Sequence, residues 1–139
     1  MSERYLLDTN IFLFRIINAE MLDKNVFGIL DDYENLLYVS SESVKEVLHL
    51  WQCGKVRFAR WKTAADIFAS IDDLRLTVKY VQPEHLLTFG ALPLVKDHHD
   101  PSDRLIIAQG ITEKMTTISS DNKFPLYRRY GLKLIYNQR

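Results

Sequence analysis

Four acidic residues are spaced along this chain in a way that could hold a divalent metal ion. They are Asp8, Glu46, Asp103 and Asp121. Carboxylates that are brought together repel one another, and such a cluster persists when a hard divalent cation neutralises it. Oxygen ligands suit Mg²⁺ or Mn²⁺, which bind through a few carboxylates and a substrate phosphate. The four residues therefore predict metal-dependent chemistry on a phosphate.

Short apolar runs alternate with longer segments of helical spacing, and these elements must position the acids. The predicted strands are 4–7, 37–39, 77–81, 116–118 and 132–136. The predicted helices are two within 11–32, then 43–53, 60–74, 83–91, 101–114 and a short one at 122–130. This alternation implies βαβ crossovers. We expect an α/β fold, a three-layer domain over 1–139 with a mostly parallel sheet of about five strands.

Three of the acids come after strands of this predicted sheet, and the fourth begins a helix that leads into one. Such folds bind ligands beyond the carboxyl ends of their strands. Asp8 comes directly after the first strand, and Asp121 follows the strand at 116–118 after two serines. Glu46 lies in the first turns of the helix after the second strand, and Asp103 begins the helix that precedes the fourth. We expect at least three of the four carboxylates to meet at one rim.

Helix capping is the alternative interpretation of the same acids, because the first amides of a helix lack partners. The segment 100–103 reads as an N-cap, an N1 proline and an acid at N3. Ser43 and Glu46 have capping-box spacing, and Asp121 could cap the short helix after it. Capping explains each position singly but does not explain why all are acids. Asp8, between an apolar strand and an apolar helix, would be costly to bury unpaired.

Composition sets limits on the class of protein. The hydrophobic content is 47% and the charged content 26%, which is ordinary for a globular protein. Asp8, Asn10 and Arg15 interrupt the first apolar stretch, so we expect neither a membrane span nor a signal peptide. Cys53 is the only cysteine, which excludes an internal disulfide and fits a reducing cytoplasm.

The formal net charge is zero, so any surface for nucleic acid must come from a local excess of cations. The segment 55–62 interleaves cations with Phe58 and Trp61, as RNA-binding surfaces do. The alternative is a helix start with both aromatic rings packed inward, which we favour for Trp61. A second basic cluster near Asp121 comprises Lys123, Arg128, Arg129 and Lys133.

The segments that carry the acids resemble the motifs of PIN-domain ribonucleases, in particular their VapC toxin branch. The opening YLLDTNIFL at 5–13 looks like the start of these proteins, and DPSDRLIIAQ at 100–109 is similar to their DPFDRLLIAQ block. SVKEV at 43–47 falls where the family has its second acid, GKV at 54–56 matches a Gly-Lys-Leu step, and TISSD at 117–121 resembles the strand before the fourth acid.

The resemblance implies that Asp8, Glu46 and Asp103 coordinate Mg²⁺ or Mn²⁺ and that Asp121 assists. Asn10 and the pair Ser119 and Ser120 would give polar support nearby. A metal ion held there would activate water for hydrolysis of an RNA phosphodiester, leaving a 5′-phosphate and a 3′-hydroxyl. The implied setting is a cytoplasmic type II toxin–antitoxin pair, with RNA as substrate and a cognate antitoxin and a homodimer mate as partners. Surplus apolar residues within 11–30 could contact such a partner.

Some residues depart from the family pattern. Lys45 stands where an aromatic residue is common, Ser102 stands where Phe is usual, and His98-His99 replaces a His-Arg pair. The two histidines could bind zinc or donate a proton, but adjacent histidines rarely share one metal, and we expect a solvated loop.

Other classes of protein remain as alternatives. A receiver domain needs an acidic pair after its first strand, and a dehalogenase-type phosphatase needs Asp where this chain has Asn10. A non-catalytic RNA- or protein-binding module of the same fold is the main alternative to the enzyme.

Overall fold

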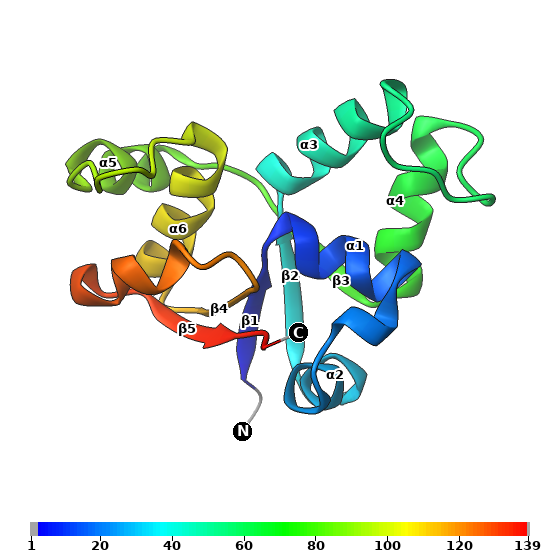
Figure 1. The fold of residues 1–139 in the computed structure, drawn as a ribbon, viewed down its shortest axis with the longest axis horizontal. Helices are drawn as coiled ribbons and strands as arrows, with labels where there is room; N and C mark the ends of the chain where they lie inside the picture. The colour runs from blue at the N-terminus through cyan, green and yellow to red at the C-terminus, as the bar shows by residue number, and fades with distance from the viewer. Residues whose placement is uncertain (1–2, 139) are drawn as a thin grey trace.

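Five parallel strands form one sheet at the centre of the computed structural model, which describes residues 3–138 (Figure 1). The order across the sheet is β3-β2-β1-β4-β5, so the first strand lies in the middle. The bounds of the strands are β1 Arg4–Leu7, β2 Leu36–Ser40, β3 Leu76–Lys79, β4 Thr116–Ser119 and β5 Lys133–Tyr136. The predicted α/β fold with about five mostly parallel strands is confirmed, and every pairing in the sheet is parallel.

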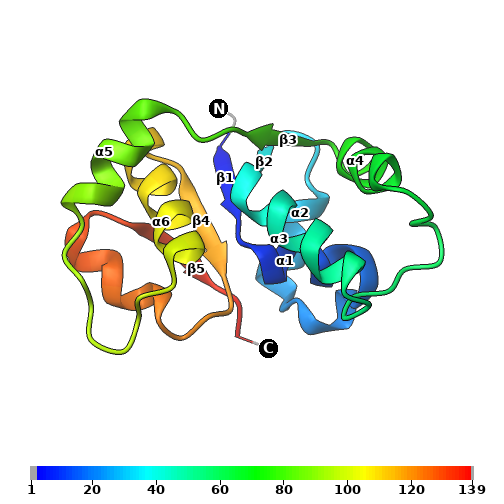
Figure 2. The same cartoon turned by 90° about the horizontal axis from the view of Figure 1, so that it is seen from above.

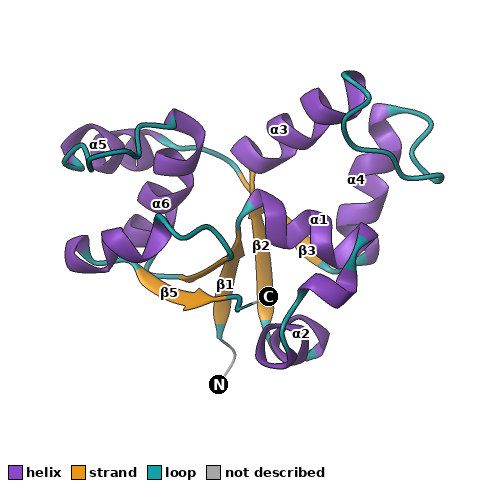
Figure 3. Ribbon diagram, in the orientation of Figure 1, coloured by secondary structure: helices purple, strands orange, loops and turns teal. Residues whose placement is uncertain are grey.

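Helices cover both faces of the sheet (Figures 2 and 3). The helices are α1 Thr9–Ile17, α2 Lys24–Asp31, α3 Ser41–Gln52, α4 Ala64–Asp73, α5 Pro83–Ala91 and α6 Pro101–Glu113, with 3-10 segments η1 Ala19–Met21 and η2 Phe124–Tyr130. Residues of α1 to α4 pack into one apolar core, and residues of α6 and η2 pack into another. The three layers follow from the crossover connections between parallel strands.

Successive side chains along each strand pack alternately into the two apolar cores. On β1, Leu6 belongs to the core beneath α6 and Leu7 to the core beneath α1. Both leucines are almost fully buried, because successive residues of a strand point to opposite faces. A strand covered on both faces reads as a continuous apolar run, which is why β1 stands out in the sequence.

The starts of α4 and α3 differ from the predicted ones, and capping explains both differences. The helix predicted from residue 60 begins at Ala64, where Thr63 and Asp66 form a capping box. The preceding loop places Trp61 in the core, with its indole N–H 2.8 Å from the Ser70 hydroxyl. The inward interpretation of Trp61 is therefore confirmed.

The second correction concerns α3. Ser43 and Glu46 do not form the capping box that their spacing allows. The helix begins two residues earlier than predicted and is capped by Ser40, whose hydroxyl accepts a hydrogen bond from the amide of Glu42 at 3.0 Å. Ser43 is instead fully buried within the helix and faces Thr9 of α1.

Parallel strands bring their carboxyl ends to one edge of the sheet, and α1 and α3 begin there directly after β1 and β2. The first turn of α6 lies at the same edge, because α6 runs back along the sheet into β4 (Figure 1). Within residues 3–138, no helix is long and apolar enough to cross a membrane.

Candidate active site

The Asp8 carboxylate lies at the carboxyl end of β1 and is 4% exposed. Its Oδ1 accepts a hydrogen bond from the amide of Ile11 at 2.9 Å, so Asp8 is the N-cap of α1. Its Oδ2 accepts a hydrogen bond from the hydroxyl of Ser119 on β4 at 2.5 Å. A carboxylate oxygen can accept more than one bond, so the capping role leaves acceptor capacity for a cation.

Asp8 is held in a place that disfavours its charge. The pKa of Asp8 is raised to about 7, mainly by burial and in smaller part by the nearby charges of Asp103 and Asp121. The hydrogen bonds from Ser119 and Ile11 act in the opposite direction without cancelling the effect of burial. Asp8 is therefore a carboxylate whose ionised form needs a compensating positive charge.

Asp103 and Asp121 lie together beside Asp8. A ligand atom of each, and one of His98, lie within 4.8 Å of one another. Asp103 stands in the first turn of α6, where its amide donates to the N-cap Asp100 at 3.0 Å, as the sequence pattern predicts. Burial and the charge of Asp100 raise the pKa of Asp103 to about 6, while a hydrogen bond with His98 opposes the shift. A hard divalent cation fits this set of oxygen donors.

Ser119 joins two of these acids. Its hydroxyl donates to Asp8 and accepts from the amide of Asp121 at 3.0 Å. The Asp121 carboxylate accepts from the amide of Lys123 at 2.8 Å, which closes the turn after β4.

Glu46 reaches this edge of the sheet from α3. Its Oε1 accepts a hydrogen bond from the hydroxyl of Thr9 at 2.8 Å, and Thr9 follows Asp8 directly in the chain. The Thr9 hydroxyl is also 3.0 Å from that of Ser43. The structure therefore brings Asp103 and Asp121 together, places Asp8 near enough for their charges to raise its pKa, and joins Glu46 to Asp8 only through Thr9. Sequence reasoning had not singled out Thr9.

A sequence model of the PIN domain matches residues 5–130, which is most of the chain. The chain belongs to the PIN domain family. No curated protein matches the chain in sequence.

Solved structures of the same fold include chains of VapBC complexes. VapBC2 from Rickettsia felis, bound to a promoter DNA fragment, matches with a TM-score of 0.67 at 21% identity over 97% of this chain and 99% of that one. VapBC from Salmonella typhimurium, also bound to DNA, matches at 0.63 and 16% identity over 98% of both chains. VapBC-1 from nontypeable Haemophilus influenzae matches at 0.60 and 18% identity over 96% and 97%.

Ser102 and Lys45, two departures from the PIN motifs, both contact Glu42 in this PIN domain. The hydroxyl of Ser102, at the start of α6, donates to Oε1 of Glu42 at 3.2 Å. The ammonium of Lys45 lies 2.9 Å from the same oxygen. A polar contact between α3 and α6 thus occurs where the family commonly has two aromatic side chains.

His98 corrects the expectation of a solvated loop. Its ring is 6% exposed and lies against the acids, whereas His99 is exposed as predicted. The Nδ1 atom of His98 is 2.7 Å from the hydroxyl of Tyr127. Tyr127 lies 29 residues further along the chain, so no local pattern could have shown this contact.

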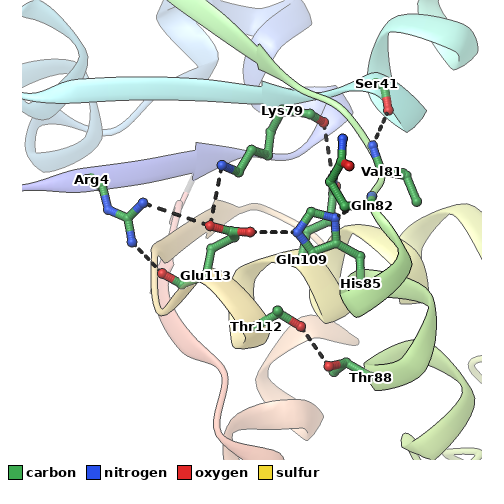
Figure 4. Close-up of polar contacts among 10 residues, drawn as sticks. All are labelled: Arg4, Ser41, Lys79, Val81, Gln82, His85, Thr88, Gln109, Thr112 and Glu113. Carbon is green, nitrogen blue, oxygen red and sulfur yellow. Dashed lines mark hydrogen bonds and ion pairs between the residues drawn. The ribbon is translucent and has the colours of Figure 1, made fainter.

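A second group of potential metal ligands in this PIN domain centres on His85 and Glu113 (Figure 4). The Nε2 atom of His85 lies 2.7 Å from Oε2 of Glu113, and its Nδ1 accepts from the amide of Gln82 at 2.9 Å. Lys79, with its Nζ 3.3 Å from Oε1, and Arg4 already supply positive charge to Glu113. Because both ring nitrogens and the carboxylate are engaged, we assign this cluster a structural role that joins β1, β3, α5 and α6.

The cations of the segment 55–62 are exposed on the loop between α3 and α4. Trp61 is buried, and Phe58 packs edge-to-face against it with ring centroids 5.4 Å apart. Trp61 is therefore not available to stack on a base, and any contact of this loop with RNA relies on its cations. In the second basic cluster, Arg128, Arg129 and Lys133 are exposed.

Proposed function

We propose that this PIN domain is a metal-dependent ribonuclease that hydrolyses phosphodiester bonds of RNA. The observation that supports the proposal is the buried Asp8 carboxylate at the end of the central strand. Its pKa is raised to about 7 by burial, and its neighbours Asp103 and Asp121 are also acids. A protein pays for such a cluster in stability unless a cation compensates it, so the arrangement favours a binding role over capping alone.

The residues would divide the work as follows. Asp8, Asp103, Asp121 and Glu46 would hold Mg²⁺ or Mn²⁺ at the edge of the sheet. When bound, the ion supplies charge neutralisation at the phosphate and lowers the pKa of a water molecule.

Neighbouring side chains fix the orientation of the acids. Ser119 and the amide of Ile11 hold the two oxygens of Asp8, and Thr9 holds one oxygen of Glu46. Groups locked in place before the reaction need no reorganisation during it.

Cleavage assays test the proposal. The purified protein is incubated with structured and single-stranded RNA in Mg²⁺ or Mn²⁺, with and without EDTA. Asp8→Asn and Asp103→Asn should each lower the cleavage rate by at least about two orders of magnitude, the scale of losing a key electrostatic group. Asp72→Asn, a change at an exposed acid on α4, is the matched control and should cleave as wild type does.

Two results would contradict the enzyme. Cleavage that resists EDTA points to a metal-free mechanism or a contaminant. Absence of cleavage on all RNAs favours the non-catalytic RNA- or protein-binding module.

We further propose that the protein acts in the cytoplasm as the toxin of a type II toxin–antitoxin pair. The motifs of the VapC branch and the structural likeness to chains of VapBC complexes support this proposal. Ile17 on α1 and Phe27 on α2 are 41% and 40% exposed, and they offer apolar surface to an antitoxin or to a second copy in a homodimer.

Growth assays test the toxin role. Expression of the protein alone should arrest bacterial growth, and Asp8→Asn should relieve the arrest. Normal growth with soluble wild-type protein, in a host that lacks the neighbouring gene, would exclude the toxin role and leave the nuclease proposal standing.

A further inference from the structure

We propose that His98 positions the carboxylate of Asp103 by donating a hydrogen bond to it, and that Tyr127 holds His98 in the tautomer that this requires. The inference rests on the proposed metal-dependent nuclease, because its consequence is a correctly oriented ligand. It concerns a residue outside the four acids.

Packing fixes the plane of the His98 ring. The residue lies in the loop before α6, and its side chain is nearly inaccessible to solvent. Phe124 and Tyr127 of η2 contact the ring edge-to-face, with centroids 6.4 and 5.4 Å away. A ring held in this way can offer its two nitrogens in only two directions, one toward Tyr127 and one toward Asp103.

The Tyr127 hydroxyl selects the tautomer. Tyr127 is fully buried, and its hydroxyl lies 2.7 Å from Nδ1 of His98. The ionised carboxylate of Asp103 on the other side of the ring can only accept, so the Nε2 atom that faces it must donate. Nδ1 is then left without a proton and accepts from the Tyr127 hydroxyl. With Nδ1 acting as acceptor, the proton of a neutral imidazole is on Nε2.

The protonated Nε2 faces the acid. It lies 3.3 Å from Oδ2 of Asp103, a distance compatible with a long N–H···O bond. The bond occupies one oxygen of Asp103 and leaves Oδ1 for a cation. Hydrogen-bond donors behind a ligating carboxylate fix its orientation, and they matter to metal affinity nearly as much as the ligand does.

Arg104, the neighbour of Asp103 in the chain, anchors the first turn of α6. Its Nη2 donates to the carbonyl of Leu92 at 2.9 Å, and its guanidinium lies over the ring of Phe89 at 5.0 Å. Arg104 follows Asp103 directly on α6. These two contacts hold in place the first turn of α6, which presents Asp103 to His98.

The competing assignment makes His98 a third ligand beside Asp103 and Asp121. Ligation would need Nε2 without its proton, and Nδ1 would then donate to Tyr127. The tyrosine oxygen would become the acceptor of this bond, and its own proton would lose the histidine as acceptor. Nitrogen ligation would also favour Zn²⁺ over Mg²⁺, which gives the two assignments different metal preferences.

Two amide substitutions test the two ring nitrogens of His98 separately. In His98→Gln the amide nitrogen can take the place of Nε2, whereas in His98→Asn it can reach only the place of Nδ1. Titration calorimetry with MgCl₂, without RNA and well below each melting temperature, gives the dissociation constant. His98→Asn should weaken Mg²⁺ binding about tenfold or more, and His98→Gln should stay within about threefold of wild type.

His85→Gln is the matched control. It also alters a buried histidine that is bonded to a carboxylate, but at the cluster of Glu113 (Figure 4). It should lower the melting temperature and leave Mg²⁺ binding unchanged. A loss of stability alone therefore cannot imitate the expected result.

The remaining outcomes overturn the assignment in distinguishable ways. If Asp103→Asn weakens Mg²⁺ binding and His98→Asn does not, the positioning role is wrong and the metal site stands. If His98→Gln loses far more affinity for Zn²⁺ than for Mg²⁺, His98 is a ligand and not a positioning residue. If wild type neither binds Mg²⁺ nor cleaves RNA, the proposed function fails and this assignment fails with it.

Discussion

Asp8 illustrates how one residue can be both a helix cap and part of a charged site. Its two oxygens accept from an amide of α1 and from the hydroxyl of Ser119. Neither donor carries a full charge, so the bonds orient the carboxylate without neutralising it. This explains why burial still raises the pKa of Asp8 to about 7 in the presence of both bonds.

Ser119→Ala tests this orienting role. The substitution removes a donor from Asp8 and an acceptor from the amide of Asp121. We expect a loss of about 1–2 kcal/mol in the free energy of unfolding near pH 7.5, because partly buried polar groups are left without partners. Urea titrations in EDTA measure it, with Ser120→Ala as the control at the next residue. Equal midpoints for the two variants would show that Ser119 does not support Asp8.

At the scale of elements, α6 presents the acid Asp103 at its start and packs tightly along its length. Residues from Ile106 to Gly110 are buried, and the helix approaches β4 closely at Gly110. A Cβ added at Gly110 would overlap Oγ1 of Thr117 on β4. The position of the first turn of α6, and hence of Asp103, depends on this approach.

Gly110→Ala should therefore destabilise the protein by about 1–3 kcal/mol, the usual effect of overfilling a packed core. Gly28→Ala on α2 is the matched control, because nothing lies within 4 Å of its added Cβ. That control should stabilise by up to about 1 kcal/mol through helix propensity. Adding Thr117→Ala should restore part of the stability lost in Gly110→Ala. Thermal melts measure these changes. Equal melting temperatures for the two glycine variants would show that α6 does not approach β4 closely at Gly110.

The order of the elements could be predicted from the sequence, whereas contacts between distant segments could not. Helix α5 was predicted at its observed bounds because a proline marks its first residue and apolar residues recur along it. The start of α4 was missed although Thr63 and Asp66 have capping-box spacing, which was the available local signal.

The candidate site shows the same contrast between local signals, which the sequence displays, and contacts between distant segments, which it does not. The four acids could be named because Asp8 and Asp121 follow predicted strands, while Glu46 and Asp103 lie in the first turns of predicted helices. Their surroundings depend on pairs such as Thr9 with Glu46, 37 residues apart, and His98 with Tyr127, 29 apart. The repulsion expected among clustered acids does contribute to the raised pKa of Asp8. The larger cause is burial, which becomes visible only once the layers are assembled.

Across the whole molecule, two groups of carboxylates respond to pH with opposite sign. The folded-state pKa values of Asp8 and Asp103 are raised to about 7 and about 6. As pH falls through these values, the folded state takes up protons that the unfolded state binds only near pH 4, so stability rises. The pKa of Glu113 is lowered, first by the hydrogen bond with His85 (Figure 4). Its contribution is present above its unfolded pKa and is lost as pH falls through the folded pKa.

The metal-free protein should therefore be most stable near about pH 5, between the two groups. From about pH 7.5 to 5.5 the gain should be on the order of 1–2 kcal/mol, and below about pH 4 stability should fall. Thermal melts in EDTA across this range measure the profile. Asp8→Asn should flatten the neutral side of the profile, and Glu113→Gln should flatten the acid side. Stability that falls steadily from about pH 7.5 downward would show that the acids act only as caps.

Binding of Mg²⁺ should offset the loss of folding stability that the ionised carboxylates of Asp8 and Asp103 cause. For an assumed dissociation constant on the order of 1 mM and about 10 mM free Mg²⁺, linkage gives roughly 1.4 kcal/mol. For a domain of this size that is about 3–6 °C in melting temperature. The shift should be larger near pH 7.5 than near pH 5.5, because Asp8 and Asp103 must lose their protons to bind a cation.

Asp8→Asn separates a metal site from a helix cap, because only a buried charge predicts a change in the melting temperature. In EDTA near pH 7.5, removal of a buried charge should raise the melting temperature, and the response to Mg²⁺ should shrink. Asp72→Asn, at the exposed acid on α4, should respond to Mg²⁺ as wild type does. If Asp8 were only the N-cap of α1, asparagine would cap the helix about as well, the melting temperature in EDTA would stay that of wild type, and wild type would ignore Mg²⁺. Because asparagine can itself cap a helix, a higher melting temperature in EDTA reports the removal of the charge, with the capping bond to Ile11 retained.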